Sequence, residues 1–255
     1  MGCIMYISIL NMKCEGLVNP LGIDNFQPRL SWKISQGQRG LKQDSYRVIV
    51  STDLDKAKNK IGDAYDSGVI RSCDPFCYYN YKGEPLQSAT KYYWQVELAF
   101  QNGEIIFSDI ASFETGLLHP DLWQGRWLGT PTSNPGVILF RKTQQLGKKI
   151  ASARAYLAAE GFAELWINGT RLNTGVLEPI NSDYNKQVYY LTFDITKNLQ
   201  TGNNAIGVAL NPGWSAHPKF LLQINVTFTD NTTQSIVSEF GDWVFISSPI
   251  TLATL

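Results

Sequence analysis

Residues 162–172 read FAELWINGTRL, and this stretch decides the kind of fold the chain adopts. Apolar and polar side chains alternate along its first positions, as they do on a half-buried strand. The pair Asn168-Gly169 then interrupts the run, and both residue types tolerate the positive φ angles of a two-residue hairpin turn. The stretch therefore predicts an antiparallel hairpin, in which Glu164 faces solvent and Trp166 belongs to the core.

The strand pattern continues after this hairpin. A second alternating run covers residues 188–194, and an apolar strand over residues 205–210 ends at the turn residues Asn211, Pro212 and Gly213. Consecutive short strands joined by polar turns are typical of antiparallel sheets. The region around the hairpin therefore reads as part of a β-sandwich.

The first half of the chain also predicts short strands, between residues 29 and 115. A leader at Leu86 and an alternating strand with Tyr92 and Trp94 match the surroundings of the tyrosine corner in immunoglobulin-like and fibronectin type III domains. Trp32 is then the core tryptophan of an earlier strand. Residues 51–62 allow one short helix or an irregular loop.

Residues 116–123, GLLHPDLW, contain Gly and Pro and show little alternation of apolar and polar residues. They mark the expected domain boundary. It divides the chain into residues 1–117 and 118–255. The second part holds roughly nine strand candidates and no reliable helix, which predicts a jelly roll of the galactose-binding-like kind. The expected fold class is all-β, with an immunoglobulin or fibronectin III-like sandwich followed by this jelly roll.

Composition limits the function classes. The chain of 255 residues has 22 Lys plus Arg and 22 Asp plus Glu, so no net field favours nucleic acid or an anionic membrane. The start MGCIMYISIL lacks the basic region and apolar length of a signal peptide or a transmembrane helix. The expected partners therefore exclude nucleic acid and membrane, and the compartment is cytoplasmic or periplasmic.

Few residues are suited to metal binding or catalysis. The two histidines, His119 and His217, each precede a proline in a predicted loop. A histidine-based metal site or catalytic triad is therefore not expected. The cysteines show no C-x-x-C spacing and are expected to be free, partly buried thiols. They all lie in the first third of the chain: Cys3, Cys14, Cys73 and Cys77.

Carboxylates and aromatic residues remain as candidates. Glycoside hydrolysis needs two carboxyl groups, but the acidic residues between Glu160 and Asp194 have no sequence feature that would perturb their pKa values, which favours structural roles. Trp214 follows the turn at Asn211 on a loop at a sandwich edge. Its indole ring either stacks on a sugar or caps the core.

The chain resembles the N-terminal, non-catalytic portion of bacterial α-L-rhamnosidases of glycoside hydrolase family 78. The first half carries the motifs CEGLVNPLGID, PRLSW and YDSGVI, and the run from Leu86 to Trp94. The second half carries WQGRWLG, LFRK, ELWINGTRL, YYLTFDIT and GNNAIGVALNPGW. Together these motifs cover nearly the whole chain, and their combination is more specific than any one of them.

The resemblance implies an accessory role. In the family, an (α/α)6 barrel that follows such β domains hydrolyses terminal L-rhamnose with acidic residues, and no part of this chain corresponds to that barrel. The implied partners are this catalytic barrel and a rhamnose-containing glycan. The chain is therefore expected to be a truncated or excised N-terminal region that scaffolds the barrel and has no hydrolytic activity alone.

The resemblance also suggests where a ligand would bind. Some members hold rhamnose through calcium at an Asp-Asn pair, and Glu160-Gly161 occupies the corresponding place here. Glutamate can bind calcium but glycine supplies no side-chain ligand, so no metal and no cofactor are expected. The candidate ligand residues are Glu160, Asn211 and Trp214. The alternatives are a freestanding carbohydrate-binding module and a structural, adhesin-like pair of domains.

Overall fold

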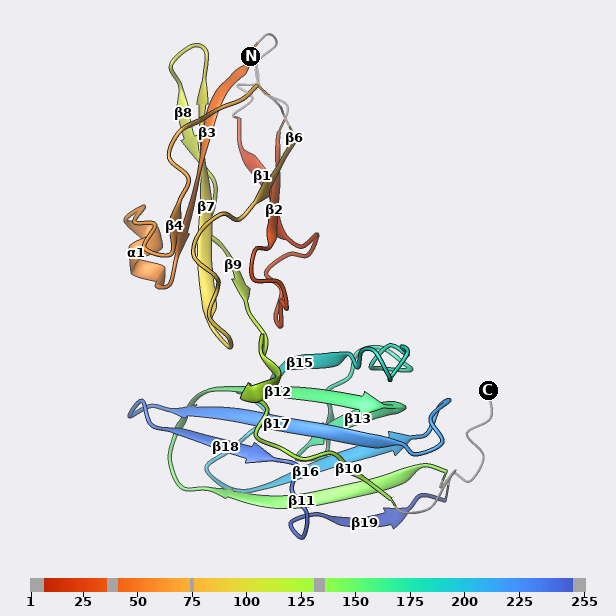
Figure 1. The fold of residues 1–255 in the computed structure, drawn as a ribbon. Helices are drawn as coiled ribbons and strands as arrows, with labels where there is room; N and C mark the ends of the chain where they lie inside the picture. The colour runs from red at the N-terminus through yellow and green to blue at the C-terminus, as the bar shows by residue number, and fades with distance from the viewer. Residues whose placement is uncertain (1–6, 36–40, 74–75, 131–135, 250–255) are drawn as a thin grey trace, which may run out of the picture. The chain divides into compact units, whose positions relative to one another are not determined.

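A computed structural model describes residues 7–35, 41–73, 76–130 and 136–249 of the chain. The chain divides into two compact units, Met1–Pro120 and Asp121–Leu255. The regular secondary structure of both units is almost entirely antiparallel strands (Figure 1), which confirms the all-β fold class. No helix among the described residues is long and apolar enough to cross a membrane.

The first unit contains two sheets. One has the strand order β1-β2-β6, and the other has the order β4-β3-β7-β8, with β5 paired to β3 and β9 paired to β7. The strands are β1 Ile9–Cys14, β2 Arg29–Ile34, β3 Gln43–Ser51, β4 Tyr65–Asp66, β5 Ile70–Arg71, β6 Phe76–Asn80, β7 Lys91–Phe100, β8 Ile105–Phe107 and β9 Ala111–Glu114. This arrangement is the expected immunoglobulin or fibronectin III-like sandwich.

Aromatic side chains fill the core of this sandwich, as the sequence predicts. Trp32 on β2 and Trp94 on β7 are both buried, and the ring of Tyr92 stacks on Phe113 at a centroid distance of 5.3 Å. The Tyr92 hydroxyl accepts a hydrogen bond of 2.9 Å from the backbone N–H of Gln87, five residues upstream. The predicted tyrosine corner is therefore present.

One short helix, α1 (Leu54–Lys58), lies in the segment for which the sequence allowed a helix or a loop. Asp53 caps it, because its carboxylate accepts from the backbone N–H groups of Asp55 and Lys56. Only Ala57 of this helix is buried, so its other side chains face solvent.

Two of the four cysteines have described side chains, and both are free thiols. Cys14 is buried and Cys73 is exposed, so the expectation of partly buried thiols fits the first of them only. Burial, together with the neighbouring Glu15 carboxylate, raises the pKa of the Cys14 thiol to about 12. Cys3 and the side chain of Cys77 lie outside the described residues.

The second unit is a sandwich of two five-stranded sheets. The first sheet has the order β10-β17-β12-β15 with β18 paired to β17, and the second has the order β14-β13-β16-β11-β19. The strands are β10 Leu128–Gly129, β11 Ile138–Leu146, β12 Ile150–Glu160, β13 Phe162–Ile167, β14 Thr170–Arg171, β15 Tyr190–Asp194, β16 Gly202–Asn211, β17 Lys219–Phe228, β18 Thr233–Val237 and β19 Val244–Ser247; the 3₁₀ turn η1 spans Pro120–Leu122.

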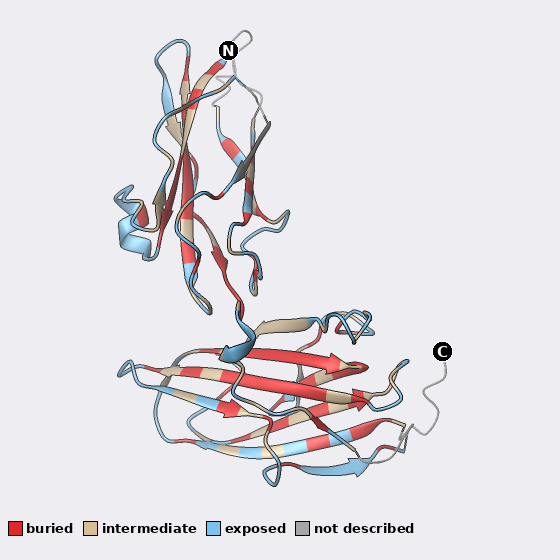
Figure 2. Cartoon of the chain, in the orientation of Figure 1, coloured by how far each residue is buried: buried red, intermediate tan, exposed pale blue. Residues whose placement is uncertain are grey.

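The two sheets of the second unit bury a common core on their facing sides (Figure 2), which agrees with the predicted jelly roll. The hairpin of β13 and β14 turns at Asn168 and Gly169, whose φ angles are 50° and 83°, so that prediction is confirmed. Ala163, Leu165 and Ile167 of β13 face this core and are completely buried.

The tyrosine corner gives a stability test. Tyr92→Phe keeps the ring but leaves the Gln87 N–H without its acceptor, which should lower the free energy of unfolding by about 1 kcal/mol. Urea denaturation measures this loss. Tyr93→Phe is the matched control, because the Tyr93 hydroxyl makes no hydrogen bond with the part of the chain that the structure describes, and it should change stability by less than about 0.5 kcal/mol. Equal effects of the two variants would show that the corner bond contributes nothing.

Candidate functional site

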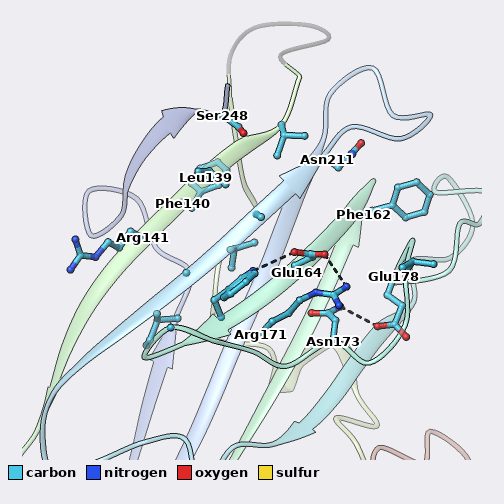
Figure 3. Close-up of a pocket in the computed structure, with 18 of the residues that line it drawn as sticks. Leu139, Phe140, Arg141, Phe162, Glu164, Arg171, Asn173, Glu178, Asn211 and Ser248 are labelled. Atoms are coloured by element: carbon cyan, nitrogen blue, oxygen red, sulfur yellow. Dashed lines mark hydrogen bonds and ion pairs between the residues drawn. The ribbon is translucent and has the colours of Figure 1, made fainter. Parts of the chain in front are cut away.

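The outer face of the sheet β14-β13-β16-β11-β19 is hollowed into a cavity of about 800 Å³. We call this cavity the trough. Its walls come from β11, β13 and β14 and from the loop 173–178, and its floor is β16 (Figure 3). The trough therefore lies over the middle of the sheet.

The trough exists because β16 carries small side chains on its outer face. Ile206, Val208 and Leu210 point into the core, so the alternation of the strand turns Ala205, Gly207 and Ala209 outward. A Cβ atom added to Gly207 would meet its nearest neighbour, the Cβ of Trp166, at 3.5 Å, which is an ordinary van der Waals contact and not a clash.

Strand register sets what stands on either side of this floor. Gly207 lies between Trp166 of β13 and Arg141 of β11. Ala209, in the next row, lies between Glu164 and Leu139. Directly paired residues share a sheet face, so these four longer side chains border the floor.

A polar network holds the β13 side of the trough. The Glu164 carboxylate pairs with Arg171 at 2.8 Å and accepts a longer hydrogen bond, 3.4 Å, from the indole N–H of Trp166. Arg171 also donates to the carbonyl oxygen of Gly175 at 2.8 Å. The carboxylate thus restrains both an aromatic ring and a guanidinium group (Figure 3).

Asn173 closes the exposed edge of β13 where β14 no longer pairs with it. Its buried amide accepts from the Leu165 N–H at 2.8 Å and donates to the carbonyl oxygen of Ala163 and to Glu178, both at 3.1 Å. One side chain therefore takes the place of a neighbouring strand and fixes the loop that walls the trough.

Two of the predicted ligand residues lie at one end of the trough. Asn211 lines it, and its side-chain oxygen accepts from the Gly213 N–H at 2.9 Å, which shapes the turn. Trp214 is 66% exposed and packs edge-on against Phe162 at 5.8 Å, so its ring is largely open to solvent. Phe162 connects the two positions, because it pairs with Asn211 and also lines the trough.

The third predicted residue, Glu160, points elsewhere. It ends β12 in the opposite sheet, and its carboxylate pairs with Lys219 of β17 at 3.0 Å. The Lys219 ammonium also lies over the ring of Trp127 at 5.4 Å. Glu160 therefore already has a cationic partner.

The neighbouring Gly161 has a structural role. Its φ is 109°, and an added Cβ would come within 2.4 Å of the Asn211 carbonyl oxygen, so no other residue fits without a shift of the backbone. Its N–H donates to the hydroxyl of Tyr184 at 3.0 Å. Among the described residues, no three His, Cys, Asp or Glu side chains lie close enough to hold a metal ion.

Comparison with known proteins assigns both units. Residues 9–119 match the family model "Rha78A-like, N-terminal immunoglobulin domain", and residues 148–255 match "Alpha-L-rhamnosidase N-terminal domain". An α-L-rhamnosidase of Formosa agariphila is 31% identical over 251 residues, and one of Alteromonas sp. is 29% identical over 266 residues. The chain belongs to the α-L-rhamnosidase family.

Solved structures of α-L-rhamnosidases agree with this assignment. The structure from Dictyoglumus thermophilum has a TM-score of 0.90 at 34% identity, and matches 97% of this chain and 30% of its own. The structure from Aspergillus terreus has a TM-score of 0.79 at 25% identity, with 96% and 30% covered.

The chain corresponds to one part of these longer proteins. It spans 27% of the Formosa agariphila α-L-rhamnosidase and 29% of the Alteromonas α-L-rhamnosidase, although the matches cover 88% and 94% of the chain itself. The matching family models are both N-terminal domains. This is the accessory N-terminal region that the motifs indicated.

The prediction that Trp166 belongs to the core is wrong. The side chain is 37% exposed and lines the trough, because it shares strand parity with Glu164 and not with the buried Leu165. Sequence reasoning also missed Arg141, Arg171 and the loop after Asn173. The strict period of two on β13, with the small outward residues of β16, was the available signal.

Asn173 offers a test of how the trough wall is held. Asn173→Ala removes the partners of a buried N–H and a buried carbonyl group, and should lower the free energy of unfolding of the second unit by about 2–3 kcal/mol. Chemical denaturation measures the loss. Asn185→Ala, at an exposed loop position, is the control and should change stability by less than about 0.5 kcal/mol. A loss below about 0.5 kcal/mol for Asn173→Ala would contradict the strand-replacing role.

Proposed function

We propose that the chain is the accessory β region of an α-L-rhamnosidase-like glycoside hydrolase and that it supports a catalytic (α/α)6 barrel in a longer protein. The observation that carries this proposal is the pair of consecutive family matches, which places the region within proteins about three to four times as long. We assign the role to two domains, residues 1–117 and 118–255.

An uncovered apolar edge supports the scaffolding role. All three apolar residues of the edge strand β19, Val244, Phe245 and Ile246, are well exposed, with between 59% and 69% of their surface open. Among the described residues only β11 pairs with this strand, so no described strand covers its other edge. Proteins normally cover or charge such edges, so β19 is the proposed contact for the rest of the longer protein.

A rhamnose-containing glycan is the proposed ligand of the loop edge. The supporting observation is the open indole ring of Trp214 beside Asn211, since an exposed ring can stack on a sugar face. The pairing of Glu160 with Lys219 supports a contact made without calcium. A freestanding carbohydrate-binding module is the less favoured alternative, because the relatives carry this region within longer chains.

An activity assay tests the absence of catalytic machinery. The purified chain should release no 4-nitrophenol from 4-nitrophenyl α-L-rhamnopyranoside above a protein-free blank, because the proposed catalytic barrel is a separate domain. Continuous absorbance measurement with a concentrated sample provides the readout. Turnover proportional to the amount of chain would contradict the accessory assignment.

A chimera tests the scaffolding role. We expect the chain to support activity when it replaces the matching 30% of the Dictyoglumus α-L-rhamnosidase, because the two backbones agree at a TM-score of 0.90. Adding Val244→Lys and Ile246→Lys should lower the inactivation temperature by several degrees, since lysine would disturb the apolar contact at β19.

Matched lysine substitutions control for surface charge. Val69→Lys changes an equally exposed valine in the first unit and should leave the inactivation temperature of the chimera unchanged. The two β19 substitutions should also leave the melting temperature of the isolated chain unchanged. Equal behaviour of the β19 variant and the Val69→Lys chimera would argue against β19 as the contact.

A further inference from the structure

We infer that the trough on the outer face of β16 binds a neutral oligosaccharide, with Trp166 as the stacking platform. Its platform, Trp166, is a different residue from Trp214 of the loop edge, although Asn211 lines one end of the trough. The inference does not depend on the proposed scaffolding role.

The shape fits a chain of flat rings. Trp166 and Arg141 stand on strands two positions apart, so roughly 9–10 Å separate the strands that carry them. Between them the floor is only Gly207, flanked along the strand by Ala205 and Ala209. A floor without protruding side chains lets a pyranose ring reach the sheet, with its C–H face against the indole.

The charge of the trough favours a neutral ligand. Its ionisable lining residues among the described part of the chain are two guanidinium groups, Arg141 and Arg171, and two carboxylates, Glu164 and Glu178. The two signs cancel, so neither an anionic nor a cationic ligand gains from the local field. A phosphate or an acidic sugar that approached Arg171 would also meet the Glu164 carboxylate, which pairs with that guanidinium.

The polar groups match hydroxyl groups, which both donate and accept hydrogen bonds. Arg141 makes no hydrogen bond or ion pair with the described residues, and its exposed guanidinium, which is directed away from the floor in Figure 3, can donate once it turns toward a ligand. Glu178 keeps one carboxylate oxygen free of the bond from Asn173 and is available as an acceptor. Donors and acceptors around an apolar floor are the arrangement that sugar recognition requires.

The platform is fixed before any ligand arrives. The Glu164 carboxylate holds the indole N–H of Trp166 and also the guanidinium of Arg171. Asn173 and the carbonyl of Gly175 fix the adjoining loop. A ligand would therefore meet an ordered surface, which reduces the entropy cost of binding.

The same face also bears aliphatic side chains, including Leu139, Val176 and Leu177. An apolar partner would use these groups but would leave the guanidinium of Arg141 and the carboxylate of Glu178 buried without new partners. A saccharide uses both kinds of group. The polar rim therefore favours the saccharide over an apolar partner.

Binding measurements on the full chain test the inference. The probes are L-rhamnose, cellotetraose, xylotetraose, maltotetraose and mannotetraose, each titrated to about 10 mM by calorimetry and by intrinsic tryptophan fluorescence. At least one tetrasaccharide should bind. Trp166→Ala should weaken that binding by roughly 30-fold or more, as is typical for a buried aromatic anchor.

Two further variants separate the trough from the loop edge. Gly207→Val fills the floor without a backbone clash, because the added Cβ meets only ordinary contacts, so it should abolish binding with an unchanged melting temperature. Trp214→Ala should leave the affinity of the tetrasaccharide within about twofold. Phe240→Ala, an exposed aromatic residue outside the trough, is the control and should behave as the unmodified chain.

Three outcomes would overturn the inference. No response to any tetrasaccharide would exclude a neutral oligosaccharide. Binding that survives Trp166→Ala and Gly207→Val but disappears in Trp214→Ala would place the sugar at the loop edge. The chain could also bind an apolar dye, lose that binding in Gly207→Val and show no response to any saccharide. This result would assign the trough to an apolar partner. The last two results leave the scaffolding proposal untouched, because neither involves β19.

Discussion

The register of β16 between β13 and β11 is the constraint on which the second unit depends. In this register Ile206, Val208 and Leu210 enter the core, while Ala205 and Gly207 face outward. A shift of one residue would exchange the two sets, exposing large aliphatic side chains and leaving small ones in the core. One choice of pairing therefore produces both the packed interior and the hollow outer face.

The two outer faces of this sandwich differ in how far side chains cover them. On the opposite sheet, Tyr156 is fully buried, with Trp123 and Tyr190 packed around it at centroid distances of 6.4 and 6.3 Å. On the trough sheet, the outward residues in the middle of the central strand are only Ala205, Gly207 and Ala209, and Trp166 stands beside them. A surface that the chain covers on one side and leaves hollow on the other points to interaction at the hollow side.

Local rules predicted much of the fold. The Asn168-Gly169 turn and the tyrosine corner at Tyr92 follow from backbone and hydrogen-bond preferences that act over a few residues. The trough did not follow in this way, because it depends on which strands flank β16, and pairing partners distant in sequence are not encoded locally. The core assignment of Trp166 rested on its position within a strand, whereas its parity with Glu164 indicated the outer face.

The predicted ligand residues show the same limit. Sequence placed Glu160 near Asn211, and their backbones do meet through Gly161, but the Glu160 side chain turns to Lys219. The direction of a side chain at a strand end depends on partners that only the assembled sheets supply. The sheet face is therefore a stronger candidate ligand site than the loop edge, because ordered polar groups surround an open floor there.

Chemical-shift mapping by NMR spectroscopy decides whether the trough binds a saccharide. On titration with the tetrasaccharide set, the indole resonance of Trp166 and the backbone amides of Ala205, Gly207 and Ala209 should shift together. Shifts confined to the residues around Trp214, or no shifts at all, would show that the trough is not a saccharide site.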